Sequence, residues 1–179
     1  EDVERAESYD LGLRVFVGQK IAFVSSTDFS HLALAGLPER AVAMARLAPE
    51  DMFAGLAPKD RLAKSLPELD LEDPVEPSAD ALIAQAREVE AAALAVAGVT
   101  NSEGGGASFS RSAVALATST GFYGRYAATN HSLGVAVLAG EGTGMERDYD
   151  HASARHAGDL RKAADIGRTA GEKAVKRLN

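Results

Sequence analysis

HSLGVAVLA, residues 131–139, carries the clearest pattern in the chain. Apolar residues alternate in it with small or polar ones, namely Leu133, Val135 and Val137 with Ser132, Gly134 and Ala136. A period of two is typical of a strand that lays one apolar face on a core. The segment therefore predicts a strand of a sheet, with small side chains on the face away from the core.

Other segments with a strand-like pattern lie on the N-terminal side of this one. Leu11–Val17 and Ile21–Ser26 flank a tight turn and predict a hairpin. Further strands are predicted over Val99–Ser102 or Ser108–Ser119, and then over Gly121–Thr129. The short connections between these runs favour antiparallel neighbours.

Three helices are predicted from capping residues and apolar spacing. The first follows the capping residues of Thr27–Ser30 and extends to about Ala48. Pro38 lies inside it, and a proline removes one backbone hydrogen bond and clashes with the preceding turn, so we expect a break or kink near Gly36–Leu37. The second helix begins after Ser78 and ends at Gly98.

The third helix covers about Ala163 to Leu178. Residues 49–77 contain five prolines and predict a long irregular connection. Residues 140–160 are glycine-rich and then charged, and we assign no element to them. The sum is an α+β fold, a mostly antiparallel sheet with three main helices packed on it, which we treat as one domain over residues 1–179.

The composition excludes several classes of protein. The 179 residues carry a formal net charge of −7, which disfavours direct binding to nucleic acid. The absence of cysteine excludes disulfides, thiolate metal sites and a cysteine nucleophile, and a reducing cytoplasm fits this composition. There is no apolar run of about 18 residues that would span a membrane, and the first residues do not form a signal peptide.

The histidines do not have the spacing of a hydrolytic zinc site. His151 and His156 lie five residues apart, which is about 140° on a helix, and no glutamate follows the first of them. His31 and His131 are isolated in the sequence. We interpret all four as surface or interface residues. The serines, Ser25, Ser26, Ser108 and Ser110, likewise have no His–Asp pattern around them.

Two glycine-rich segments resemble nucleotide loops only superficially. Gly140–Gly144 has the spacing G-x-G-x-G and is followed by charged residues, so we predict a flexible loop. Gly104–Gly106 precedes no Lys-Ser or Lys-Thr pair, and we predict a mobile turn or bulge. The nearby acids lack the spacing of a calcium loop, and we expect them to form ion pairs with Arg147 and Arg155: Glu141, Glu146, Asp148 and Asp150.

Five short strings, in this order, resemble the TldD/PmbA family, whose members are often called modulators of DNA gyrase. They are Ser25–Ser30, Asn101–Gly105 leading into Ser108–Ser110, Ser119–Phe122, Met145–Tyr149, and Ala154–His156 before Asp159 and Leu160. The string Met145–Tyr149 is more similar to the PmbA (TldE) branch than to the TldD branch.

The resemblance implies a cytoplasmic protein that is longer than this chain, with an α+β N-terminal domain and a β-rich C-terminal domain. It implies that two subunit types pair and that the TldD-type subunit holds zinc on a His-Glu-x-x-x-His helix. This sequence contains no such string. We therefore expect a non-catalytic subunit domain of a zinc metalloprotease assembly that processes peptides, with no catalytic residue, metal ligand or cofactor of its own.

The expected partners are a TldD-type subunit or a second copy of the chain, and a small unfolded peptide. A peptide can add to a sheet edge through its backbone, and small residues such as Gly134 and Ala136 let a backbone approach. Possible peptide or partner contacts are Ser132, Gly134, Ala136, Glu146, Arg147, Asp148 and Tyr149. The alternatives are an interaction module that modulates a target such as DNA gyrase without proteolysis, and a domain that binds a small ligand through residues 140–150.

Overall fold

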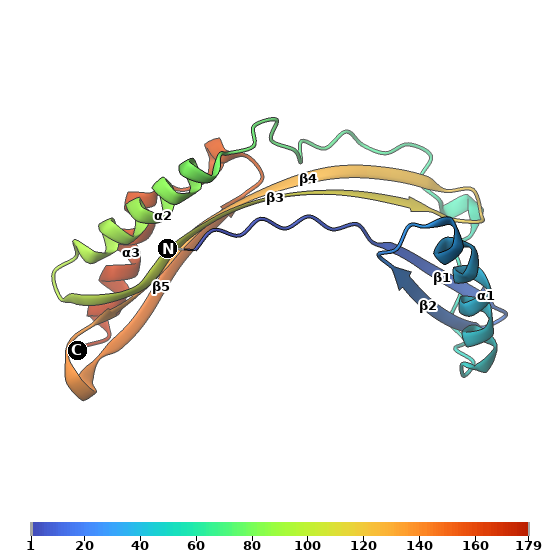
Figure 1. Ribbon diagram of the computed structural model, residues 1–179, viewed down its shortest axis with the longest axis horizontal. Coiled ribbons are helices and arrows are strands. Elements are labelled where there is room, and N and C mark those ends of the chain that lie inside the picture. The colour runs from blue at the N-terminus through green and yellow to red at the C-terminus, as the bar shows by residue number, and fades with distance from the viewer. Residues whose placement is uncertain (1, 179) are drawn as a thin grey trace. The chain divides into compact units, whose positions relative to one another are not determined.

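The computed structural model describes residues 2–178, which form three α-helices and five β-strands, so the α+β class is confirmed (Figure 1). The described residues divide into two compact units. The first holds the residues up to Lys64 together with Ala117–Phe122, and the second holds Ser65–Leu116 and the residues from Tyr123 onward. Each unit has its own sheet, one of two strands and one of three, where the sequence predicted a single sheet.

The first unit contains a hairpin covered by a helix. β1 (Leu11–Val17) and β2 (Lys20–Ser26) pair antiparallel, as predicted, and α1 (His31–Leu47) packs against both strands. Ser30 caps the helix, since its Oγ accepts a hydrogen bond from the Ala33 amide at 3.3 Å. Apolar side chains of hairpin and helix meet in a small core: Val24, Leu37 and Ala41, with Leu13, Val15 and Leu34 around them.

Pro38 does not interrupt α1: the helix continues over 17 residues, so of the break or kink predicted near Gly36–Leu37 the break does not occur. The proline is exposed, so water can reach the carbonyl that it leaves without a donor. Leu37 and Ala41 are buried against the hairpin on the other side of the helix. Their packing outweighs the local preference for a break.

The remaining helices lie close to their predicted positions. Before them, residues 49–77 contain one regular element, the 3₁₀ helix η1 (Lys59–Arg61), in line with the irregular connection that was predicted. α2 (Ala79–Leu94) starts at Ser78, whose Oγ accepts a hydrogen bond from the Ala81 amide at 3.2 Å, but it ends a few residues before Gly98. α3 covers Ala163–Lys176.

The strands of the second unit differ from those predicted. β3 covers Val99–Ala117 and β4 covers Tyr123–Ala139, so two long strands replace the shorter runs. β5 (Glu146–Ala154) lies where the sequence was given no element. The sheet has the order β3–β4–β5, and β4 and β5 pair antiparallel from His131↔Ala154 to Ala139↔Glu146.

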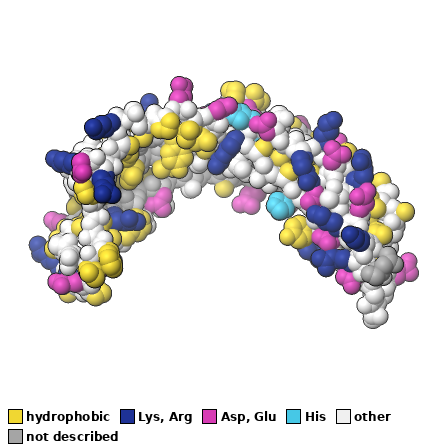
Figure 2. Space-filling view, turned by 180° about the vertical axis from the view of Figure 1, so that it is seen from behind, with side chains coloured by type: hydrophobic (Ala, Val, Ile, Leu, Met, Phe, Trp, Pro, Cys, Tyr) yellow, Lys and Arg dark blue, Asp and Glu magenta, His cyan; other side chains and the backbone are white. Residues whose placement is uncertain are grey.

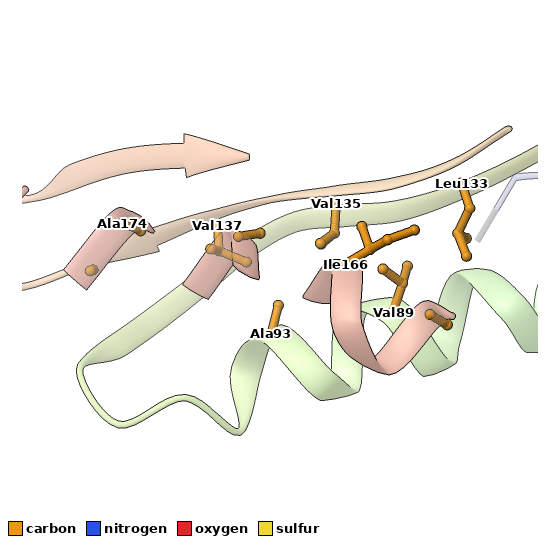
Figure 3. Close-up of a cluster of buried hydrophobic side chains, with 10 residues drawn as sticks. Val89, Ala93, Leu133, Val135, Val137, Ile166 and Ala174 are labelled. Atoms are coloured by element: carbon orange, nitrogen blue, oxygen red, sulfur yellow. The ribbon is translucent and has the colours of Figure 1, made fainter. Parts of the chain in front are cut away.

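α2 and α3 cover one face of this sheet (Figures 1 and 3). The odd-numbered β4 residues from His131 to Ala139 are buried beneath the helices, and the even-numbered ones are half-buried on the opposite face. Val89 and Ala93 of α2 and Ile166 of α3 complete the cluster. Burial of one large aliphatic side chain contributes about 1.5–3 kcal/mol, so this core sets the register of the sheet.

α3 lies against α2 at two glycines. A Cβ atom on Gly167 would come within 2.2 Å of the Val89 carbonyl oxygen and 2.7 Å of the Ala92 Cβ, and one on Gly171 within 2.6 Å of Val96 Cγ2. Interiors packed this closely have no room for an added methyl group unless the backbone moves. The absence of a side chain at Gly167 and Gly171 therefore allows α3 to lie this close to α2.

The substitution Gly167→Ala is expected to destabilise the protein by roughly 1–3 kcal/mol, because the added methyl forces α2 and α3 apart. This result would reverse the intrinsic helix preference for alanine over glycine. Gly36→Ala in α1 is the matched control: no atom lies within 4 Å of the added Cβ, and a gain of about 0.5–1 kcal/mol is expected. Denaturant unfolding with hydrogen exchange at α1 and α3 measures both effects. A stabilising Gly167→Ala would contradict the close contact.

Candidate functional site

The face of the three-stranded sheet that points away from α2 and α3 contains an open hollow of about 420 Å³. Its floor is formed by Gly134 and Ala136, two of the small β4 residues that alternate with the buried ones. Gly104 of β3 lines it as well, and β5 contributes the larger side chains of Arg147, Tyr149 and His151. The hollow thus joins all three strands of one sheet.

Gly134 has no room for a side chain, because β5 approaches it closely. Gly134 stands opposite His151 in the register of β4 and β5, and a Cβ atom added to it would lie 2.9 Å from the His151 Cβ. The next residue on the same face, Ala136, adds one methyl group. Small residues in a strand often mark a place where another chain approaches closely.

Arg147 and Glu103 connect the two outer strands. The Arg147 Nε lies 2.9 Å from both carboxylate oxygens of Glu103, and one Nη lies 2.7 Å from Oε2. Because Glu103 belongs to β3, Arg147 to β5, and β4 lies between these strands, the ion pair spans the central strand. This hydrogen bonding lowers the pKa of Glu103 and raises that of Arg147, so both groups keep their charge.

Aromatic groups form a row along β5. The rings of Tyr149 and His151 are stacked, with centroids 6.0 Å apart and planes at 24°. The guanidinium carbon of Arg147 lies 5.9 Å from the centre of the Tyr149 ring, within the range of a cation–π contact. Tyr149 is nevertheless 52% exposed. The row is therefore held in place and still presents ring surface to a ligand.

The other face of β5 is acidic and pairs with α3. Asp148 Oδ2 lies 2.5 Å from Nε of Arg177, and Asp150 contacts Arg161 and, at 3.0 Å, Nζ of Lys173. Basic and acidic side chains lie beside each other on this part of the surface, at the right of Figure 2. Burial alone would raise the pKa of Asp150, but the hydrogen bonds from Arg161 and Lys173 bring it below its usual value.

The structure gathers some of the predicted contact residues and separates others. Gly134, Ala136, Arg147 and Tyr149 line the hollow. Ser132 lies on the same face of β4 and outside the lining, whereas Glu146 and Asp148 belong to the opposite face of β5.

The predicted pairing of the acids with Arg147 and Arg155 is wrong. Asp148 binds Arg177, which directly follows α3, Asp150 binds Lys173 of α3, and Arg147 binds Glu103. Arg155 instead donates to the Thr129 carbonyl at 3.1 Å. The alternation of side chains along β5 explains the difference, because it places Arg147 and the two acids on opposite faces of the sheet.

A buried polar cluster around Asp73 has no counterpart in the sequence pattern. Asp73 accepts hydrogen bonds from the amides of Ala157 and Val75, at 2.8 and 2.9 Å, and these lower its pKa despite burial. Its own amide donates to Thr129 Oγ1 at 2.8 Å. His131 Nε2 lies 3.1 Å from Asp73 Oδ2, but the geometry of this contact is not that of a hydrogen bond.

The cluster fastens the chain before α2 to the middle of β4. Leu71 and Asp73 both contact Thr129, through the hydrogen bond from the Thr129 amide to the Leu71 carbonyl at 2.9 Å and through the bond from the Asp73 amide. His131 is therefore buried inside the second unit and is not the surface or interface residue predicted for it. Only the spacing of an aspartate and a distant histidine marks these residues in the sequence, and that signal is too common to be used.

Comparisons with known proteins agree with the strings noted in the sequence. The model of the PmbA/TldA metallopeptidase central domain matches residues 72–178, and that of the PmbA/TldA metallopeptidase domain 1 matches residues 1–45. The chain belongs to the PmbA/TldD family. It is 36% identical over 180 residues to metalloprotease PmbA of Escherichia coli O157:H7 and 30% identical to the metalloprotease PmbA homolog of Haemophilus influenzae. It is covered completely in both matches and spans 40% of the length of each relative.

Solved structures of the PmbA/TldD family show the same fold. A candidate modulator of DNA gyrase from Bacteroides thetaiotaomicron superposes with a TM-score of 0.84 at 24% identity, over 93% of this chain and 39% of that one. TldE from Thermococcus kodakarensis superposes with a TM-score of 0.67 at 16% identity, over 92% of this chain and 36% of that one.

A metallopeptidase family implies a metal, and the described residues do not fit one. Within residues 2–178, no three His, Asp or Glu side chains converge in a way that would hold an ion. His156 lies 3.0 Å from Asp70 Oδ1, and His151 is in the row beside Tyr149. Over the same residues, none of the helices combines the length and the apolar character that a transmembrane span requires.

Asp150→Asn is expected to destabilise the second unit by about 1–3 kcal/mol at pH 7, because Arg161 and Lys173 lose their charged partner. The folded-state pKa of Asp150 is lowered, so the carboxylate stabilises fully above the unfolded pKa near 4. The contribution is lost as the pH falls through the folded pKa, and the difference between the variants should shrink there. Glu172→Gln, at an exposed position of α3, is the control, with an expected change within about 0.5 kcal/mol. Denaturant unfolding between pH 7 and 3 measures both, and a pH-independent difference would contradict this account.

Proposed function

We propose that this chain is a non-catalytic, peptide-binding part of a cytoplasmic TldD/TldE-type zinc metallopeptidase assembly. A TldD-type subunit supplies the zinc and the hydrolytic chemistry, and the present residues hold the unfolded peptide. The observation that carries the proposal is the hollow on the open sheet face, built from Gly134 and Ala136 and bounded by residues of both neighbouring strands. Its volume, about 420 Å³, is in the range of ligand-binding sites.

The floor of the hollow suits an extended chain. Gly134 and Ala136 lie on the same face of β4 as Ser132. Every second residue of this part of the strand therefore places a small side chain on the open face. A peptide lying across it comes close to the sheet, and one of its side chains enters the hollow. Addition of the peptide to a sheet edge would leave the hollow unused, so we place the peptide on the face.

The rim contributes polar groups that orient a peptide. The Tyr149 hydroxyl and the ring nitrogens of His151 donate or accept hydrogen bonds, and both side chains reach the open face from β5. Arg147 is fixed by Glu103 and holds the end of the row in position. Such a site recognises backbone and a single side chain, as a subunit that handles many peptides requires.

The substitution Ala136→Tyr fills the hollow and is expected to weaken peptide binding about tenfold or more. The reason is that the leucine side chain of the peptide can no longer enter the hollow. Its burial contributes roughly 1.5–3 kcal/mol, and the loss of that energy weakens binding about tenfold or more. The ligand is a fluorescein-labelled peptide of glycine, serine and alanine with one central leucine, and fluorescence anisotropy measures its dissociation constant. Ala84→Tyr, at an exposed position of α2, is the matched control and should bind as the unchanged protein does. Equal binding by the Ala136→Tyr and Ala84→Tyr proteins would contradict the site.

A second measurement separates this proposal from modulation without proteolysis. The chain alone should not hydrolyse the peptide. On addition of a TldD-type subunit, chelator-sensitive hydrolysis should appear, with KM raised by Ala136→Tyr and not by Ala84→Tyr. Hydrolysis by the chain alone would refute the non-catalytic role. Tight binding to DNA gyrase that is indifferent to chelators, without any hydrolysis in the pair, would favour the interaction module.

A further inference from the structure

We infer that the hollow selects peptides by an aromatic side chain, and that the exposed ring of Tyr149 is the residue that determines this preference. The inference rests on the proposed function and makes it more specific, since it names the kind of side chain that the site takes. It depends on three features of the hollow: the row of rings on one wall, the low floor and the neutralised charge at one end.

The wall of the hollow is aromatic and already ordered. Tyr149 lies between Arg147, at 5.9 Å from its ring centre, and the stacked ring of His151 at 6.0 Å. The ring therefore has a contact on each side, and a side chain that is ordered before binding loses less rotational freedom when a ligand binds. A ring that enters the hollow meets the rim of this row, where offset or edge-to-face contacts form at centroid distances of about 4.5–7 Å.

The floor favours a planar group over a branched one. Gly134 has no side chain and Ala136 only a methyl group, so the bottom of the hollow is low along β4, and the His151 Cβ lies close to Gly134. The face of a ring can lie on such a surface with all its atoms in contact. A branched aliphatic side chain has contact over fewer of its atoms, because its methyl groups point away from the floor.

The charge of the hollow excludes the alternative of an acidic side chain. Arg147 is the cation in the lining, and Glu103 holds it through three contacts of 2.7–2.9 Å. A peptide carboxylate would have to displace Glu103 from this bidentate pair to bind Arg147. A neutral aromatic side chain of the peptide can bind without displacing Glu103 from Arg147. The Arg147–Glu103 ion pair therefore stays intact when such a ring enters the hollow.

The test compares two labelled peptides of glycine, serine and alanine that differ only in the central residue, phenylalanine in one and leucine in the other. The unchanged protein should bind the phenylalanine peptide about three- to tenfold more tightly, as expected for one aromatic pair. Tyr149→Leu should reduce this ratio to about one. Tyr149→Phe should keep the ratio.

Tyr126→Leu is the matched control, because Tyr126 is a 55% exposed β4 tyrosine that is not in the lining of the hollow, and the ratio should be unchanged. A second readout is the alanine methyl NMR signal of Ala136, which the phenylalanine peptide should move upfield by its ring current and the leucine peptide should not. An equal affinity of the unchanged protein for both peptides, or a ratio that survives Tyr149→Leu, would overturn the inference. If both peptides bind equally and Ala136→Tyr blocks both, the proposed function stands and only the aromatic preference is refuted. If neither peptide binds, the proposed function itself is refuted.

Discussion

The burial of one face of β4 beneath α2 and α3 is the constraint on which the second unit depends. Leu133, Val135 and Val137 supply that face, and Ile166 and Val89 meet them from the two helices (Figure 3). The helices reach this depth because Gly167 and Gly171 have no side chains at their crossing with α2. Since a strand has a period of two, burying the odd-numbered residues also determines what the opposite face displays. The small residues on the floor of the hollow are thus a consequence of the core, because residues 131–139 supply both the buried face and the open face.

The orientation of β5 depends on ion pairs. Asp148 and Asp150 face α3 and are met there by Arg177, Arg161 and Lys173. Partly exposed ion pairs of this kind contribute modestly to stability individually. Their effect here is on orientation, because they hold the inward face of β5 against the helix. Arg147, Tyr149 and His151 then point to the open face, where the hollow lies.

The sequence predicts those elements in which apolar spacing and burial agree. β1, β2 and the helices follow from it, and so does the apolar alternation of residues 131–139 within β4. β5 does not, because its inward residues include acids whose partners, in α3 and directly beside its two ends, lie more than ten residues away in the chain. Pro38 misleads for the opposite reason: its local penalty is real, but the buried neighbours Leu37 and Ala41 outweigh it. In both cases a contact distant in sequence decides the local structure.

The same distinction applies to the candidate site. Gly134 and Ala136 could be selected from the sequence because their small size interrupts an apolar pattern, and Arg147 and Tyr149 because they belong to a string that resembles the family. His151 could not be selected, because its place depends on the pairing of β5 with Gly134. A shift of that pairing by one residue would turn Tyr149 toward α3 and Asp150 toward the hollow. The Asp73 cluster acts against such a shift, since it binds Thr129 within β4 and the Ala157 amide just after β5. A buried carboxylate away from the hollow therefore helps to keep the aromatic row in register with the small residues that it faces.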